Sequence, residues 1–206
     1  MTVAAIDPHA VQYRPNPGPA SKRIIVGYGF WIFLLSDFVM FSAFFAAYAV
    51  LSGQTAGGPS GKDLFNLTTV AIETAALLLS SFACGMAALA VQTRQSWKVY
   101  AASASTFMFG LVFLGLEINE FAKMVAEGAG PQRSAFLSSF FALVGLHGLH
   151  VTAGLVWLTV MMGQIATRGF PMNTLRRFLC FALFWHALDI IWVALFTVVY
   201  LIGAGK

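Results

Sequence analysis

The 206-residue sequence has little charge: only 10% of its residues are Asp, Glu, Lys or Arg, whereas 59% are hydrophobic. A soluble core of this size cannot hide so much apolar surface. A water-soluble fold is therefore excluded, and lipid is the expected solvent. An N-terminal apolar stretch followed by a cleavage site is also missing, so we expect no cleaved signal peptide.

Cysteine and clustered basic residues are scarce as well. Cys84 and Cys180 both lie within apolar runs, a placement that fits neither a disulfide framework nor a thiolate metal site. The net charge is +4, but the basic residues are scattered between apolar segments, so we expect no nucleic-acid binding. The sequence contains no phosphate-binding loop, dinucleotide fingerprint or nucleophile elbow. We expect no catalytic site in this chain.

What the sequence does contain is five apolar segments, each long enough to cross about 30 Å of hydrocarbon as a helix. They predict an all-α membrane protein, a bundle of five transmembrane helices. The expected helices are residues 27–51, 67–92, 97–122, 135–166 and 178–202. Residues 1–25, which contain four prolines, are predicted to form a flexible cytoplasmic arm, and residues 26–206 the five-helix transmembrane domain.

The distribution of Lys and Arg predicts the orientation. Eight of them fall on the side of the N-terminal arm and of the second and fourth connections, and four fall on the other side. Because positive charge is retained in the cytoplasm, we expect the N-terminus in the cytoplasm and the C-terminus outside. Trp31, Trp97 and Tyr200 fall near predicted helix ends, where amphipathic rings favour the membrane interface.

Polar residues inside the predicted spans are expensive in hydrocarbon and should face protein. Asp37, His147 and Asp189 fall near the middle of the first, fourth and fifth spans. His150 lies three residues after His147, and His186 three before Asp189, so each pair shares a helix face. We expect these five residues to form a structural polar seam that joins the three spans.

Three glutamates fall nearer the outer ends of the second and third spans: Glu73, Glu117 and Glu120. They predict an outer acidic cluster that is partly hydrated, and a solvated rim of the bundle is the simpler interpretation.

Other interpretations of the histidines are weaker. Imidazoles bind metal or haem, but a closed site needs three or four convergent donors, and His147 and His150 are interleaved with Gly145, Gly148 and Gly154, which favour close helix packing. We therefore expect no metal or haem in this chain. Proton conduction would need a ladder of titratable residues that reaches a surface, and none is evident.

Two strings carry a family resemblance: HGLHVTAG at residues 147–154 and WHALDIIW at residues 185–192. Both resemble signatures of subunit III of the haem-copper oxidases. The likeness extends through residues 30–37, 73–74, 117–121 and 138–143. That family usually has seven helices, and its ubiquinol-oxidase branch resembles it without the first two, so five spans favour that branch.

The resemblance implies a non-catalytic accessory subunit of a proton-pumping ubiquinol oxidase in the bacterial cytoplasmic membrane. It implies contact with subunit I, which would carry the haem and copper, and with subunits II and IV. It also implies a phospholipid-filled cleft between the first two spans and the other three, with Trp31 and Asp37 beside it, and support for assembly and for sustained proton uptake by subunit I. The family often has Glu where Asp37 stands, and Phe where Ala187 stands.

Two further functions remain open. The chain could be a subunit III-like partner of a cytochrome c oxidase or nitric oxide reductase. A free-standing transporter is a different class; it should show an internal repeat and broken helices, and neither is detected in the sequence.

Overall fold

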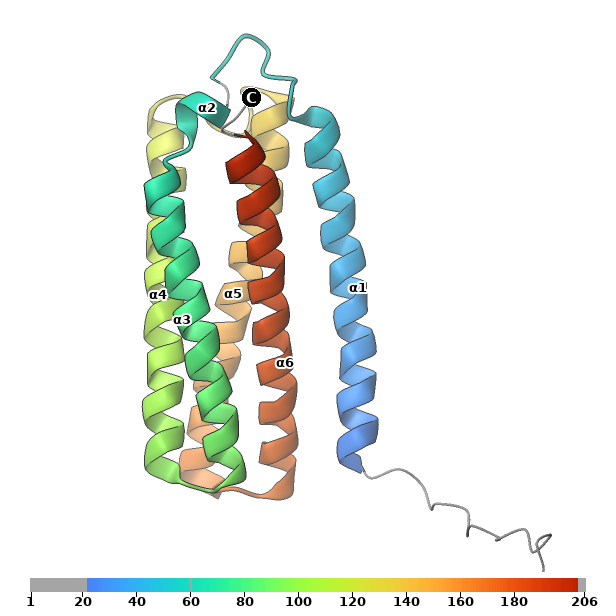
Figure 1. The fold of residues 1–206 in the computed structure, drawn as a ribbon, viewed down its shortest axis with the longest axis vertical. Helices are drawn as coiled ribbons and strands as arrows, with labels where there is room; N and C mark the ends of the chain where they lie inside the picture. Colours follow the sequence, from blue (N-terminus) through green and yellow to red (C-terminus); the bar gives the residue numbers. More distant parts are fainter. Residues whose placement is uncertain (1–21, 60, 204–206) are drawn as a thin grey trace, which may run out of the picture.

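The computed structural model describes residues 22–59 and 61–203 (Figure 1). The helices are α1 Lys22–Leu51, α2 Gly61–Leu64, α3 Leu67–Gln92, α4 Ser96–Ala126, α5 Ala135–Arg168, α6 Met172–Leu195 and the π-helical segment η1 Phe196–Leu201. Residues 1–21, most of the predicted arm 1–25, lie outside the described residues. Residues 22–25 already belong to α1.

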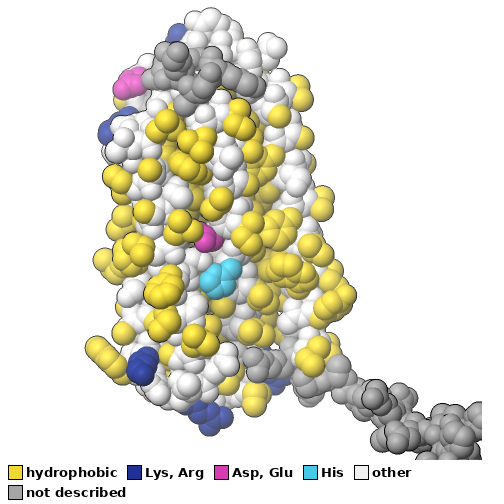
Figure 2. All heavy atoms as spheres, in the orientation of Figure 1, with side chains coloured by type: hydrophobic (Ala, Val, Ile, Leu, Met, Phe, Trp, Pro, Cys, Tyr) yellow, Lys and Arg dark blue, Asp and Glu magenta, His cyan; other side chains and the backbone are white. Residues whose placement is uncertain are grey.

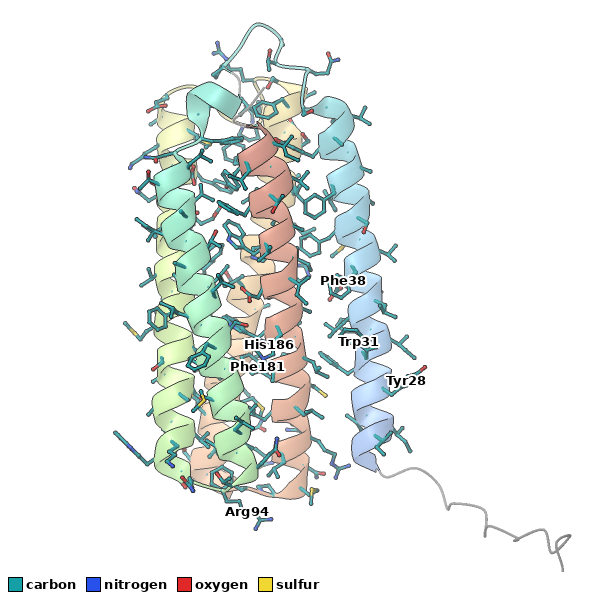
Figure 3. All side chains as sticks on the ribbon, viewed as in Figure 1. Tyr28, Trp31, Phe38, Arg94, Phe181 and His186 are labelled. Carbon is teal, nitrogen blue, oxygen red and sulfur yellow. The ribbon has the colours of Figure 1, made fainter. Side chains whose placement is uncertain are left out.

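Five of these elements are long and apolar enough to cross a membrane, as the sequence predicted. α3, α4, α5 and α6 form a four-helix bundle in which α3 contacts α4 and α6, and α5 contacts the same two helices. α1 packs on the outside of this bundle, against α5 and α6 (Figure 1). We refer to the two ends of the molecule as the α2 end, where α2 lies, and the Arg94 end, labelled in Figure 3.

This packing differs from the expected division of the spans. The family resemblance implied a cleft between the first two spans and the other three, but α3 packs directly against α4 and α6. The reason is the short turn at residues 93–95, which holds α3 and α4 together as an antiparallel hairpin. α1 is therefore the helix that stands apart.

The helix boundaries reflect polar groups more than hydropathy. The side chain of Asn66 accepts hydrogen bonds from the backbone N–H groups of Thr68 and Thr69 and begins α3, and the Ser134 hydroxyl caps α5 at Leu137 N. α6 begins six residues before the predicted residue 178, because its first turns are polar and carry Arg176. A prediction based on the extent of apolar runs misses such polar turns, although they form regular helix.

Trp185 of α6 fills the centre of the four-helix bundle. Its indole Nε1 donates a hydrogen bond to Ser80 Oγ of α3 over 3.0 Å. A Cβ atom added at Gly154 of α5 would lie 2.7 Å from the Trp185 ring, and one added at Gly110 of α4 would lie 3.2 Å from it. The two glycines thus leave the space that the indole occupies, and one side chain contacts all three neighbouring helices.

The outer surface is mostly apolar. Figure 2 shows hydrophobic side chains over the whole visible face, with Lys and Arg at its two ends. Within the most hydrophobic window of α1, only 11% of the residues are buried. Ser42, Ala43, Ala46 and Ala47, whose spacing favours tight helix contact, are exposed in this chain. Lipid or another subunit must cover this face of α1.

Candidate functional site

The three predicted acidic residues meet inside the bundle at the α2 end. One carboxylate oxygen from each of Glu73, Glu117 and Glu120 lies within 4.8 Å of the other two. Glu73 is in the second turn of α3, and the other two share a face near the end of α4, so the antiparallel hairpin brings them to one level. We call this group the acidic cluster.

The acidic cluster is buried, which differs from the hydrated rim expected from the sequence. Glu73 is 0% exposed, Glu117 3% and Glu120 9%. Among the described residues, none provides a hydrogen-bond partner for any of the six carboxylate oxygens. Two ionised carboxylates no more than 4.8 Å apart repel each other by at least roughly 3.5 kcal/mol at an effective dielectric constant of about 20. A cation or protons must therefore offset the charge of this cluster.

Tyr200 of η1 borders the acidic cluster. The side chain is 0% exposed, and its hydroxyl has no hydrogen-bond partner in the part of the chain that the structure describes. The expectation that Tyr200 lies at the membrane interface is therefore wrong. The π-helical turn and the packing of η1 against α3 turn the ring inward, where it contacts Phe65 with a centroid distance of 4.9 Å. Trp31 and Trp97, the other two predicted interface residues, are exposed.

His147 lies in an aromatic enclosure. The rings of Trp192, Phe113 and Phe41 have centroids 5.1, 5.8 and 6.3 Å from the imidazole. The imidazole is fully buried, and no residue within 22–59 or 61–203 forms a hydrogen bond with either of its nitrogens. This environment can pack the ring but offers it no polar contact.

His150 is half-buried one turn further along α5. Its Nδ1 lies 2.8 Å from the Leu146 carbonyl oxygen, within its own helix. The imidazole also faces Phe41 of α1, with a centroid distance of 5.3 Å. Asp37 precedes Phe41 by four residues and is half-buried, so it lies on the same face of α1.

His186 and Asp189 of α6 face a different helix. His186 Nδ1 lies 2.7 Å from Ser81 Oγ of α3. Asp189 Oδ1 is buried and has no hydrogen-bond partner. Both side chains line a cavity of about 580 Å³ beside α3. Figure 3 labels His186 between α3 and α6, and Figure 2 shows acidic and histidine side-chain atoms together at mid-height on an otherwise apolar face.

The five residues of the predicted seam therefore lie on two faces. His147 and His150 face the rings of α1, α4 and α6, whereas His186 and Asp189 face α3. Residue spacing correctly pairs residues within one helix, but it does not fix which neighbouring helix each pair faces. Ser81 was missed for the same reason, since it is an ordinary serine that lies 105 residues from His186 in the chain.

Basic residues and aromatic rings meet at the Arg94 end of α1. Val26 and Phe30 of α1, Trp157 of α5, and Arg176 and Arg177 of α6 line a cavity of about 490 Å³. We call it the α1 cavity. Trp31 and Asp37, the residues expected beside a lipid cleft, are not among its lining residues, but Trp31 directly follows Phe30.

Comparison with known proteins now gives the family. The family model described as cytochrome c oxidase subunit III matches residues 19–204, which include all five spans. The chain belongs to the cytochrome c oxidase subunit III family. The resemblance of residues 147–154 and 185–192 is thereby confirmed, and the chain is a multi-pass membrane protein of that family.

Similar proteins of the subunit III family come from several bacteria. A Pseudomonas aeruginosa protein named cytochrome bo(3) ubiquinol oxidase subunit 3 is 55% identical over 86% of this chain and 85% of its own length. A protein of the same name from a Buchnera aphidicola strain is 40% identical over 93% of this chain and 97% of its own length. A Bacillus subtilis protein named quinol oxidase subunit 3 is 44% identical over 86% of this chain and 87% of its own length.

Proposed function

We propose that this chain is the accessory subunit III of a proton-pumping ubiquinol oxidase in a bacterial cytoplasmic membrane. The observation that carries the proposal is the 55% identity, over most of both chains, with a protein named as a subunit of a ubiquinol oxidase. The chain packs against subunit I, contacts subunits II and IV, and assists assembly and sustained proton uptake. The exposed face of α1, with its small residues Ser42 and Ala46, supports a helix contact outside this chain.

In this proposal the haem and copper belong to subunit I, and the chain has no catalytic site. The histidine environments support this assignment. His147 is enclosed by aromatic rings, and His186 pairs with Ser81 on another face. Among the described residues, no histidine belongs to a group of three or more candidate metal ligands.

Phospholipid binding is part of the same proposal. The α1 cavity combines an apolar wall from Val26, Phe30 and Trp157 with two guanidinium groups at its polar end. A phospholipid places its phosphate beside such cations and its acyl chains along the apolar wall. Arg176 is held by Asn173 Oδ1 over 2.7 Å, and Arg177 by Gln164 Oε1 over 3.0 Å, so both are already oriented.

Purification of the tagged chain in mild detergent tests the assignment. We expect co-purification of a haem-containing large subunit and oxygen uptake that depends on ubiquinol. Uptake driven by reduced cytochrome c alone would move the chain to a cytochrome c oxidase. Recovery of a colourless protein without partners would contradict the accessory role and favour a transporter.

Lipid retention tests the α1 cavity separately. Native mass spectrometry of the complex should find less bound phospholipid in the double variant Arg176→Gln and Arg177→Gln than in the unmodified protein. Arg168→Gln is the matched control, because Arg168 is an exposed arginine at the same end that does not line the α1 cavity. Equal lipid retention in all three proteins would rule out this binding site.

A further inference from the structure

The acidic cluster has a geometry that the accessory role does not explain. Three buried carboxylates converge within 4.8 Å, and none of their oxygens receives a hydrogen bond. Buried carboxylates in proteins are normally paired with cations, hydrogen-bonded or bound to metal. In the described part of the chain, no group forms a hydrogen bond with these carboxylate oxygens.

Tyr200 adds an independent observation. Its hydroxyl is a fourth oxygen that is completely buried and unpartnered. Its hydroxyl lies close enough to Glu117, Glu120 and Glu73 for their charges to act on it. The residue sits in a π-helical turn, a distortion that is frequent at functional sites. The Tyr200 side chain, which comes from near the C-terminal end of the sequence, therefore lies beside the three carboxylates of the acidic cluster.

The spacing of the oxygens is compatible with a Ca²⁺ site. Two ligands of one Ca²⁺ can be up to roughly 5 Å apart, because each bond is about 2.3–2.6 Å long, whereas Mg²⁺ with bonds of about 2.1 Å spans at most about 4.2 Å. The oxygens of the acidic cluster lie within 4.8 Å of one another, inside the range that one Ca²⁺ can bridge. Oxygen ligands from carboxylates are the set that Ca²⁺ prefers.

The charge of the three glutamates also favours a divalent ion. Lys123 lines the same cavity as Glu120. If the three glutamates are ionised, one lysine and one divalent ion neutralise them, whereas a monovalent ion leaves one buried negative charge.

A cavity at the α2 end connects the surface of the bundle with the acidic cluster. This cavity of about 130 Å³ is lined by the polar groups Asn66, Thr69, Asn119, Glu120 and Lys123. Lys123 and Asn119 are exposed, so this cavity reaches from the surface of the bundle to Glu120, a member of the acidic cluster.

We propose that Glu73, Glu117 and Glu120, with the Tyr200 hydroxyl beside them, bind one divalent cation of the size of Ca²⁺ between α3, α4 and η1. The histidine pattern predicted no metal in this chain, and the convergence of the glutamates becomes visible only in the fold. The proposal concerns this chain alone and does not depend on the accessory role.

Calcium binding to the purified complex tests the site. The complex is stripped with EGTA and equilibrated with radioactive Ca²⁺, and we expect one fewer bound ion in Glu117→Gln than in the unmodified complex. Asp37→Asn is the control, because it removes a carboxylate from α1 and should keep the full number. Tyr200→Phe should weaken binding severalfold. Equal numbers of ions in the unmodified protein and in the Glu117→Gln variant would refute the proposal.

A measurement on the unmodified complex covers the case in which the variants fail to assemble. Electron cryo-microscopy with Ca²⁺ should show density between the three carboxylates that disappears after EGTA treatment. The competing outcome is that the glutamates hold protons. Infrared bands of protonated carboxyl groups that persist in saturating Ca²⁺, without density at the site, would overturn the proposal. If the chain purifies without an oxidase, the same two measurements apply to it, so failure of the accessory role and failure of the ion site remain distinguishable.

Discussion

His147 is a fully buried polar side chain that the sequence highlights, and its enclosure is aromatic. Replacing a buried polar group that has no partner by an apolar one of similar volume costs little. We expect His147→Leu to leave the thermal midpoint of the assembled subunit nearly unchanged. His186→Leu should lower stability by about 0.6 kcal/mol, typical of a hydrogen bond between membrane helices, because it loses the contact with Ser81.

Thermal retention of the subunit in the complex measures both variants. A large loss of stability in His147→Leu would mean that an unseen partner, such as a water molecule, satisfies the imidazole. The order of the two effects is the informative quantity, since both variants remove the same group.

Asp37 is the residue whose role rests most on the family. Asp37→Asn keeps the volume of the side chain and removes its charge and its capacity to bind a proton. If the carboxylate assists proton uptake, the initial rate of ubiquinol oxidation should change less than twofold, while the number of turnovers before inactivation falls severalfold. Oxygen uptake recorded until activity stops measures both quantities.

Ser36→Ala is the matched control for Asp37. Ser36 is the neighbouring exposed residue, and its hydroxyl donates only to the Phe33 carbonyl oxygen of its own helix. Identical inactivation of the two variants would assign the effect to a disturbance of α1 and would remove Asp37 from proton uptake.

Among single residues, the sequence predicted the acidic cluster better than the polar seam. Glu73 and Glu117 lie at similar distances in sequence from the turn at residues 93–95, so a hairpin of two helices places them at one depth. No comparable constraint links the fifth span to a particular neighbouring helix. The sequence therefore contains no indication that His186 contacts Ser81. Tyr200 could not be placed because a π-helical turn changes the direction of every side chain after it.

At the scale of elements, close helix packing depends on glycines that admit Trp185. Gly154→Ala adds a Cβ atom 2.7 Å from the indole ring. Because the ring is also held by Ser80, we expect a loss of about 1–3 kcal/mol from overpacking. The thermal midpoint of the subunit and its yield in the complex should both fall.

Gly163→Ala is the control on the same helix. No heavy atom lies within 4 Å of its added Cβ, so the substitution should be neutral or slightly stabilising because Ala favours helix. Equal behaviour of the two variants would mean that α5 and α6 separate easily enough to accommodate a methyl group.

The extent of the elements followed closely from the sequence, apart from their polar turns. Five apolar runs predicted five helices, and the helix from Leu67 to Gln92 agrees at both ends. The first turns of α6 were missed because Asn173, Arg176 and Arg177 interrupt the apolar run. Hydropathy reports where a helix meets hydrocarbon, whereas the helix itself continues into the polar region.

At the scale of the whole molecule, the orientation remains a prediction. With eight of the twelve basic residues assigned to the Arg94 end and the N-terminal side, that end should face the cytoplasm. We expect a C-terminal alkaline phosphatase fusion to be active in bacterial cells and a C-terminal green fluorescent protein fusion of the same chain to be dark. The reverse pattern would invert the topology.

The position of α1 outside the bundle predicts tolerance to a break in the chain. Ala56 and Gly57 are exposed in the loop after α1, and both have positive φ angles that suit a turn. A protease site inserted between them and then cut should leave α1 bound through α5 and α6. Co-purification of the two fragments measures the association.

The same insertion at Arg94 is the control. Arg94 lies in the turn at residues 93–95, which joins α3 to α4, the helices that share the acidic cluster. This turn is too short to absorb an insertion without moving the two helices. We expect this insertion to reduce the amount of assembled subunit strongly. Loss of α1 after cutting the first loop would mean that the covalent link holds the helix in place.

The contacts of Trp185 also limit how this chain can change over generations. Its indole lies against Gly110 and Gly154 and donates a hydrogen bond to Ser80. A substitution at position 185 therefore changes the space available to three other positions on three helices. A smaller residue at position 185 would make larger residues at 110 and 154 acceptable, while each of those larger residues is harmful when it arises first. The order of mutation therefore matters, and related sequences should show these positions varying together.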